Sequence, residues 1–279
     1  MSLTKNIQQI AARLLSEETV SAVIGFQPST LPQIAAPVIV QKEDDANRLV
    51  WDDHCWINLA TYLTPDTNRV GIIAKGCDAR NIVVHIMEHR IARDKLYIIG
   101  IPCQGMKKEG GELQDNCAQC QHKSPVLVDE MMDAQAGAIQ KDDFGDVLAI
   151  EEMTPSERQA YFAKLFSTCI RCYACRNVCP LCYCPVCFVD DAKPQWVGKG
   201  LDKTDVLTFH FLRAFHCAGR CTNCGACERA CPMNINMRIL TRKLNKTCKE
   251  LFDWEAGLSL DSRPPLETYV PTDPDVFIE

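Results

Sequence analysis

Hydrophobic positions in the first third of the chain follow a helical period and then a strand period. From Lys5 to Glu18 apolar residues recur at helical spacing, which predicts an amphipathic helix. Four short apolar runs have the length of strands: Val20–Phe26, Ala36–Val40, Val70–Ala74 and Lys95–Gly100. Helices are also expected at Glu43–Leu49, at Cys55–Leu63, and from Asp78, the expected N-cap, to about Ala92.

The strand at Val70–Ala74, the helix after it and the strand at Lys95–Gly100 make one strand–helix–strand unit. Units of this length place their strands parallel, with a right-handed crossover. We therefore expect residues 1–150 to form an α/β domain with a small, mostly parallel sheet.

The pattern changes from Thr154 onward. Thr154 and Glu157 have the spacing of a capping box around Pro155, which predicts a helix through Phe166. Helical spacing returns at Asp205–His216 and at Asn236–Leu251. A domain boundary is expected near residue 151. A second domain should cover 151–260, followed by an extended, proline-rich tail over 261–279.

Cysteine is the most informative residue type, with 18 copies in 279 residues. Two stretches, Cys169–Pro180 and Cys221–Pro232, spell C-x2-C-x2-C-x3-C-P. In two-cluster ferredoxins the fourth cysteine of such a run binds the other cluster. The runs predict two 4Fe–4S clusters and an α+β, dicluster ferredoxin-like domain with a helical insertion. The two expected ligand sets are Cys169, Cys172, Cys175 with Cys231, and Cys221, Cys224, Cys227 with Cys179.

Three other uses of these cysteines fit less well. A disulfide framework suits small secreted chains, whereas this sequence is long and begins without a signal-like apolar run. One tetrathiolate zinc site does not explain two four-cysteine runs that each end in Cys-Pro. The radical-SAM spacing CxxxCxxC occurs from Cys175 and from Cys217, but only by overlap with the runs, and no repeating β/α pattern follows.

A third cluster is predicted in the first domain. Cys77 and Cys103 each follow the carboxyl end of an expected strand, which is the edge where open α/β sheets bind ligands. Cys117 and Cys120 follow on a polar loop that can fold back over this edge, so that four thiols would converge. The alternative is that Cys77 and Cys103 are ordinary buried residues. Cys55 is a further candidate for one of the four positions.

Cys182, Cys184 and Cys187 place three more thiols within six residues. They predict a possible fourth centre, which needs one more ligand. Candidates for that ligand are Cys217, its neighbour His216 and Cys55. The alternative is that the three thiols line the protein around the second cluster. Cys248, alone on a helical pattern, is expected in the core.

Composition narrows the class of protein. The net charge of −6 argues against nucleic acid as the main partner. No apolar stretch approaches the roughly 18 residues that a membrane span needs. A cytoplasmic location is expected, where thiols serve metals rather than disulfides. The sequence has no GxGxxG after a strand and no GxxxxGK[ST]. The tail ends in the apolar residues Val276, Phe277 and Ile278, so it is expected to lie across a partner subunit or across the first domain.

The segments Lys75–Arg80 (KGCDAR) and Ile99–Gly105 (IGIPCQG), followed by Cys117-x-x-Cys120, resemble the beta subunits of deazaflavin-dependent hydrogenases and formate dehydrogenases. Together with the two cysteine runs, the chain resembles a bacterial branch of that family. Its members are iron–sulfur subunits associated with heterodisulfide-reductase-type and formate dehydrogenase complexes of anaerobic metabolism. The resemblance implies that the four thiols of the first domain hold a cluster.

The resemblance implies an electron-transfer subunit. It would relay single electrons between a flavin-containing, heterodisulfide-reductase-like partner and a catalytic subunit such as formate dehydrogenase or hydrogenase. A second hypothesis is that the chain binds a flavin and converts hydride equivalents to single electrons itself, although no motif supports a flavin or deazaflavin site. A third is a non-redox module whose clusters are structural.

Overall fold

The computed structural model describes residues 2–31, 34–65 and 68–265. The chain forms two compact units. Of the described residues, unit 1 comprises those up to Lys141 together with Gly257–Ser262, and unit 2 comprises Asp142–Ala256 and 263–265. Within the described ranges, no helix is long and apolar enough to cross a membrane. The apolar end of the tail, for which docking is expected, lies outside the described residues.

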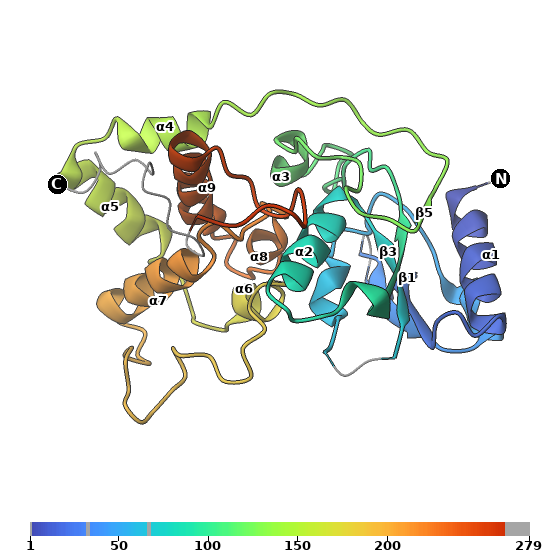
Figure 1. Cartoon of the computed structure of the whole chain (residues 1–279). Helices are drawn as coiled ribbons and strands as arrows, with labels where there is room; N and C mark the ends of the chain where they lie inside the picture. Colours follow the sequence, from blue (N-terminus) through green and yellow to red (C-terminus); the bar gives the residue numbers. More distant parts are fainter. Residues whose placement is uncertain (1, 32–33, 66–67, 266–279) are drawn as a thin grey trace. The chain divides into compact units, whose positions relative to one another are not determined.

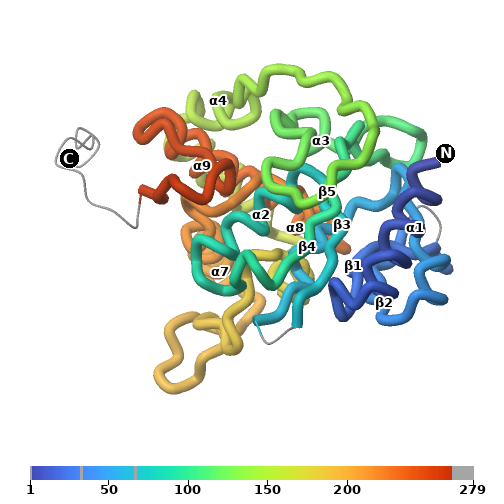
Figure 2. Tube along the Cα trace, turned by 45° about the vertical axis from the view of Figure 1, so that its right-hand side comes forward, coloured from blue at the N-terminus to red at the C-terminus, as the bar shows by residue number. Residues whose placement is uncertain are grey.

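Unit 1 is built on a five-stranded sheet of order β2-β1-β3-β4-β5 (Figure 2). Its strands are β1 (Ala22–Gln27), β2 (Ala36–Val40), β3 (Val70–Ala74), β4 (Leu96–Gly100) and β5 (Glu130–Met131). The β1–β2 pair is antiparallel, and β1, β3, β4 and β5 pair in parallel. The predicted α/β class is confirmed, with a mixed sheet. The sequence did not predict β5, because two residues are too few to show a period.

Helices cover this sheet. Figure 1 shows α1 (Leu3–Ser16) and α2 (Gly76–Met87) on either side of the strands. The predicted apolar stripe of α1 is confirmed, since Ile7, Ala11 and Leu14 are buried. Every residue of β3 is buried, as expected for a parallel strand with both faces covered. The carboxyl end of β3 leads directly into α2, which places Cys77 in the first turn of the helix.

The start and end of α2 differ from the sequence prediction. Asp78 is the third helical residue rather than the N-cap, and its carboxylate accepts the backbone N–H of Lys75 at 2.9 Å. The helix ends at Met87 instead of continuing to about Ala92. The reason is that His89 adopts a left-handed backbone conformation with φ of +53°, which turns the chain away.

The α-helices predicted at Glu43–Leu49 and Cys55–Leu63 are wrong in type. The chain forms only short 3₁₀ helices there, η1 (Glu43–Arg48) and η2 (Leu59–Tyr62). Side chains take the backbone donors that an α-helix would use. The Asn58 side chain accepts the N–H of Ala60 at 3.2 Å, and Asp78 accepts that of Leu59 at 2.8 Å. Two further short elements follow in unit 1, η3 (Arg93–Lys95) and α3 (Asp115–Ala118).

Unit 2 is helical in its described residues. Its helices are α4 (Gly145–Glu151), α5 (Pro155–Leu165), α6 (Ala174–Asn177), α7 (Lys203–His216), α8 (Ala226–Arg229) and α9 (Arg238–Phe252). The capping box is confirmed, since Thr154 Oγ1 accepts the N–H of Glu157 at 3.3 Å. The strands of the expected α+β arrangement are not found in these residues. The segments that lead into the two runs are the helices α5 and α7, which end with three and four residues between them and the first cysteine of each run.

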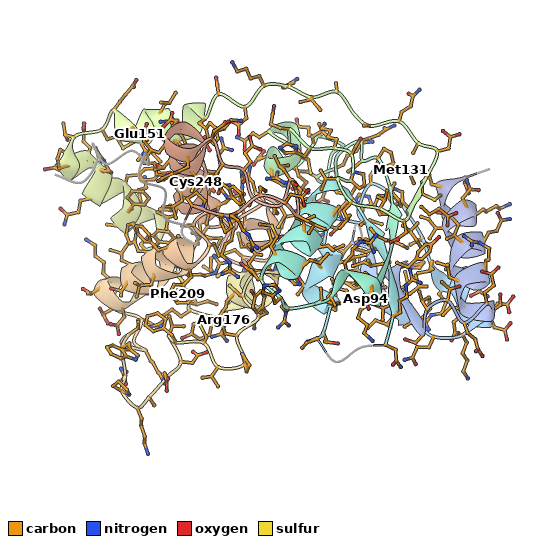
Figure 3. The ribbon with its side chains drawn as sticks, in the orientation of Figure 1. Asp94, Met131, Glu151, Arg176, Phe209 and Cys248 are labelled. Atoms are coloured by element: carbon orange, nitrogen blue, oxygen red, sulfur yellow. The ribbon has the colours of Figure 1, made fainter. Side chains whose placement is uncertain are left out.

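The core of unit 2 is formed where these helices meet. Phe209 on α7 is 1% exposed and lies edge-on to the Tyr173 ring, with 5.2 Å between ring centroids (Figure 3). Val206 on α7 and Ile239 on α9 belong to the same buried cluster. Cys175 is part of it too, so the apolar core and the first cysteine run are packed as one body.

Candidate iron–sulfur sites

The two cysteine runs of unit 2 fold alike. Arg171 and Asn223, which precede the second cysteine of each run, have φ of +48° and +58°. Tyr173 and Gly225, which follow that cysteine, have φ of +60° and +75°. Each run then continues into a four-residue helix, α6 or α8. Left-handed residues at matched positions curl the backbone around one point, so each run turns its first three thiols toward a common centre.

The fourth cysteine of each run affects the pKa values of cysteines in the other run. Burial and, beyond it, the charges of Cys169, Cys172 and Cys231 raise the pKa of Cys175. In the second set, burial and then the charge of Cys179 raise the pKa of Cys224. The charge of Cys179 also raises the pKa values of Cys221 and Cys227. With burial as the larger cause, the pKa of Cys227 reaches about 12. These charge effects are consistent with the two ligand sets expected from the sequence, which stay a prediction.

Backbone N–H groups point at several of these sulfurs. The N–H of Arg171 donates to Cys169 Sγ at 3.4 Å, and that of Ile235 donates to Cys231 Sγ at 3.5 Å. The same contact occurs in unit 1, where the N–H of Gly105 donates to Cys103 Sγ at 3.2 Å. Such hydrogen bonds favour a thiolate, which is the form that binds metal.

His210 on α7 is a neighbour of the first set that sequence reasoning missed. Its Nε2 lies 3.3 Å from Cys169 Sγ, and its ring stacks on Phe166 with 4.2 Å between centroids. Burial, and then the charges of Arg213 and Arg171, lower the pKa of His210 to about 3. A neutral ring can donate Nε2–H to a thiolate without adding a charge.

Arg213 on α7 lies beside both sets. Its side chain is buried and donates to the Cys175 carbonyl at 2.8 Å. Charges of Cys227 and Cys179 as well as Cys175 act on it, and they raise its pKa even though burial alone would lower it. Its Nε is buried without a hydrogen-bond partner. A buried cation with a free donor close to thiols of both predicted sets fits a negatively charged iron–sulfur group, whose sulfur atoms accept hydrogen bonds.

A third group of thiols converges in unit 1. Burial, together with the charges of Cys117 and Cys120, raises the pKa of Cys103 to about 11. The charges of Cys77 and Cys103 both raise the pKa of Lys75, so both thiols lie near this lysine. These charge effects are consistent with the four cysteines predicted for a third cluster at the carboxyl ends of β3 and β4, and that ligand set stays a prediction. Buried thiols with raised pKa values stay protonated unless a cation is bound, which is the behaviour of a thiolate metal site.

A buried ion pair lies beneath this third group. Lys75 Nζ is 2.8 Å from Asp78 Oδ2, and their side chains are 2% and 0% exposed. Lys75 also donates to the Ile57 carbonyl at 3.0 Å. Burial would lower the pKa of Lys75, but Asp78 and the thiols Cys77 and Cys103 raise it overall. The ammonium therefore remains charged and offsets the negative charge of neighbouring thiolates.

Tight backbone contacts also fix the third group. A Cβ at Gly76 would lie 2.0 Å from the carbonyl oxygen of His122, so only glycine allows this approach. Gly105 has φ of +104°, and a Cβ there would meet Cys117 Cβ at 3.4 Å. These contacts hold the loop that carries Cys117 and Cys120 against the start of α2.

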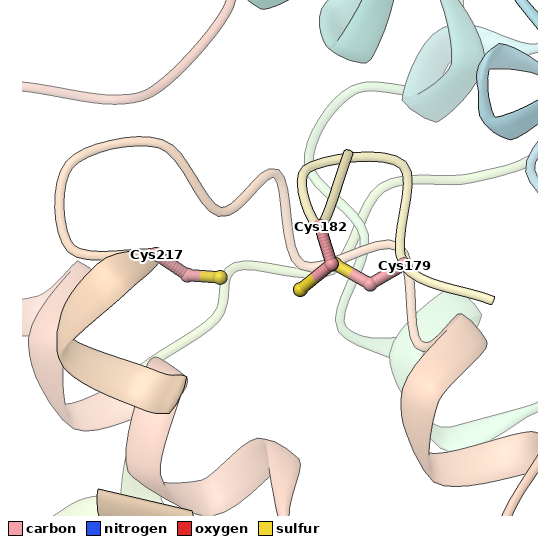
Figure 4. A group of neighbouring side chains, drawn as sticks. All are labelled: Cys179, Cys182 and Cys217. Carbon is pink, nitrogen blue, oxygen red and sulfur yellow. The ribbon is translucent and has the colours of Figure 1, made fainter. Parts of the chain in front are cut away.

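Among the cysteines outside the three predicted four-thiol sets, Cys182 and Cys217 lie close to Cys179. The sulfurs of Cys179, Cys182 and Cys217 all lie within 4.8 Å of one another (Figure 4). Hydrogen bonds from Cys182 and Cys217 lower the pKa of Cys179. Cys184 is exposed. Cys187 is hydrogen-bonded to Arg176.

The other cysteines and the candidate histidine lie elsewhere. Cys55 is fully buried in unit 1, where its sulfur accepts the N–H of Asp52 at 3.4 Å. His216 lies against Phe188, with 5.2 Å between ring centroids. Cys248 on α9 is half-buried rather than fully enclosed (Figure 3).

No family model matches this chain. Part of it is similar to two archaeal proteins. It is 34% identical over 117 residues to the F420-dependent formate dehydrogenase subunit beta of Methanocaldococcus jannaschii, covering 42% of this chain and 30% of that protein. It is 31% identical over 123 residues to the F420-dependent formate dehydrogenase 1 subunit beta of Methanococcus maripaludis, covering 44% and 30%. The chain spans about 30% of the length of the curated relatives it matches.

Proposed function

We propose that the chain is an iron–sulfur electron-transfer subunit of an oxidoreductase complex of the formate dehydrogenase type. It would relay single electrons between a flavin-containing, heterodisulfide-reductase-like partner and a catalytic subunit such as formate dehydrogenase or hydrogenase. The proposal is supported by the effect of Cys231 on the pKa of Cys175 and of Cys179 on the pKa of Cys224, because exchange of the fourth cysteine between the runs is the ligand arrangement of two-cluster ferredoxins.

Twelve thiols would hold three 4Fe–4S clusters. The ligands would be Cys169, Cys172, Cys175 and Cys231 for the first cluster, Cys221, Cys224, Cys227 and Cys179 for the second, and Cys77, Cys103, Cys117 and Cys120 for the third. When bound, such clusters supply one-electron transfer. Around them, His210 and Arg213 would donate hydrogen bonds in unit 2, and Lys75 would balance charge in unit 1.

The partners follow from the resemblance and the similar proteins. Both relatives are named as beta subunits of formate dehydrogenases, which supports a multi-subunit complex for this chain. The association with a heterodisulfide-reductase-type flavoprotein, the bacterial branch of the family and the cytoplasmic location belong to the same proposal.

The second candidate is that the chain itself converts hydride equivalents to electrons at a bound flavin. The relatives' printed names, which include F420 dependence, favour it. Purification under nitrogen decides between the two candidates, because a hydride-converting subunit would retain a reducible flavin.

The test is anaerobic purification of the native complex, followed by iron and sulfide analysis. We expect about twelve irons per chain, four for each set of four thiols, together with co-purification of a catalytic oxidoreductase subunit. About eight irons would remove the cluster of unit 1 from the proposal. A chain that purifies alone, with clusters that cannot be reduced, would refute the electron-transfer function.

A further inference from the structure

We propose that Cys217 is a reserve ligand for the second cluster, able to take the place of Cys179. This inference rests on the proposed function, because it concerns the cluster of Cys221, Cys224 and Cys227. It assigns a role to a buried thiol that belongs to neither four-thiol set.

The sulfur of Cys217 is already close to the position it would take. Cys179, Cys182 and Cys217 lie within 4.8 Å of one another (Figure 4). A metal–thiolate bond is about 2.3 Å long, so a metal bound to Cys179 would lie within about 7 Å of the Cys217 sulfur. A change between staggered χ1 rotamers moves a cysteine sulfur by about 3 Å. A side-chain rotation directed toward that metal covers most of the distance, and a backbone shift of up to about 2 Å covers the rest.

The backbone of Cys217 is joined to the second run. Cys217 follows the last residue of α7, and its N–H donates to the Ala214 carbonyl at 3.0 Å. Its own carbonyl accepts the N–H of Cys221, four residues later, at 2.9 Å, which joins Cys217 to the first ligand of that run. Its side chain is 3% exposed, so solvent is excluded while Cys217 replaces Cys179 as a ligand.

Cys182 is less suited to this role. Its N–H donates to the Cys179 carbonyl at 3.0 Å, so its backbone is fixed to the segment that carries the original ligand. Cys217 comes from a separate helix and remains in place when that segment shifts. Arg213, one helical turn before Cys217, keeps a positive charge beside whichever thiolate is bound.

The experiment compares iron content and electron paramagnetic resonance spectra of four full-length variants prepared under nitrogen: Cys179→Ala, Cys217→Ala, the double variant of both, and Cys179→Ala with Cys248→Ala. Alanine is chosen because a serine oxygen can itself bind iron. Cys217→Ala should keep the iron content of the wild type, because Cys179 still binds the cluster. Cys179→Ala should keep its full iron content, with a shifted signal for the second cluster. The double variant should lose about four irons, the content of one cluster, whereas the control with Cys248→Ala should lose none beyond Cys179→Ala.

Two results would overturn the inference. One is the loss of about four irons in Cys179→Ala alone, which would make Cys179 indispensable. The other is full iron content in the double variant, which would exclude Cys217 as the replacement. The signal of the first cluster reports in each variant whether unit 2 has folded. Absence of that signal and of the iron from the wild type would instead count against the proposed function.

Discussion

Replacing Lys75 by methionine removes one half of the buried ion pair in unit 1 while nearly keeping the length of the side chain. The ammonium is 2.8 Å from Asp78 Oδ2 and 3.0 Å from the Ile57 carbonyl, and both charged side chains are almost completely enclosed. Breaking a buried pair by removing one partner costs about 3–5 kcal/mol, because the other charge is left uncompensated. That is a large part of the roughly 5–15 kcal/mol that stabilises a typical folded protein.

Two backbone donors remain on Asp78 in this variant, from Lys75 and Leu59, at 2.9 and 2.8 Å. They partly compensate the carboxylate, so the lower end of the range is expected, about 3 kcal/mol. For a chain of this size 1 kcal/mol corresponds to about 2–4 °C in Tm. The Tm of unit 1 should therefore fall by about 6–12 °C, which circular dichroism of the full chain under nitrogen can measure.

Lys107→Met is the matched control. Lys107 Nζ lies 2.5 Å from Asp53 Oδ2, but these side chains are 42% and 48% exposed. An exposed pair contributes at most about 1 kcal/mol, so Tm should change little. Adding Asp78→Asn to Lys75→Met removes the stranded charge and should recover part of the loss. Equal Tm values for Lys75→Met and Lys107→Met would refute the reasoning.

Two further predictions concern groups beside the thiols. Arg213→Gln should lower the reduction potentials of both clusters of unit 2 by about 100 mV. This is the Coulomb energy of one charge at about 7 Å with an effective dielectric constant of about 20. Potentiometric titration would show no shift if the guanidinium were only structural. Gly76→Ala should displace His122, whose carbonyl oxygen would lie 2.0 Å from the new Cβ, and with it the loop that carries Cys120. Iron analysis should then show a loss of about four irons, with the spectra of the unit 2 clusters unchanged; full iron content would contradict the tight contact.

The local pattern of apolar and turn residues was sufficient to predict the strands and the long helices. The bounds of β2 and β3 agree with the prediction to the residue, because each is a short apolar run between turn residues. The segment before β3 was mispredicted because its backbone donors are taken by side chains. One of these, Asp78, is 19 residues further along the chain from Leu59. A periodicity of apolar residues carries no information about such a contact.

The grouping of the thiols was accessible from sequence because cysteine spacing itself encodes the curl of the backbone. Gly225 and Asn223 are residue types that often adopt positive φ. Arg171 and Tyr173 are not, and their positive φ could be expected only because they occupy the matching positions of the first run. Cys217 was among the candidates named from sequence to join Cys182, but spacing alone could not choose between Cys217, His216 and Cys55, because the approach of Cys217 depends on how α7 packs. The closeness of Cys179 to both thiols likewise follows from tertiary packing and not from spacing.

The insertion between the two cysteine runs is better understood as part of the sites than as a spacer. Its helix α7 places His210 beside Cys169, Arg213 beside both sets and Cys217 beside Cys179. These three residues are separated by three and then four positions, the spacing that aligns side chains on one face of a helix. The opposite side exposes Phe215, which is 59% accessible. A neutral donor, a fixed cation and a spare thiol on one rigid helix can be held in place together, whereas a flexible loop would leave each to move independently. Unlike a minimal two-run ferredoxin, this chain can therefore adjust the charge, hydrogen bonding and ligand supply of its cysteine sets through a single element.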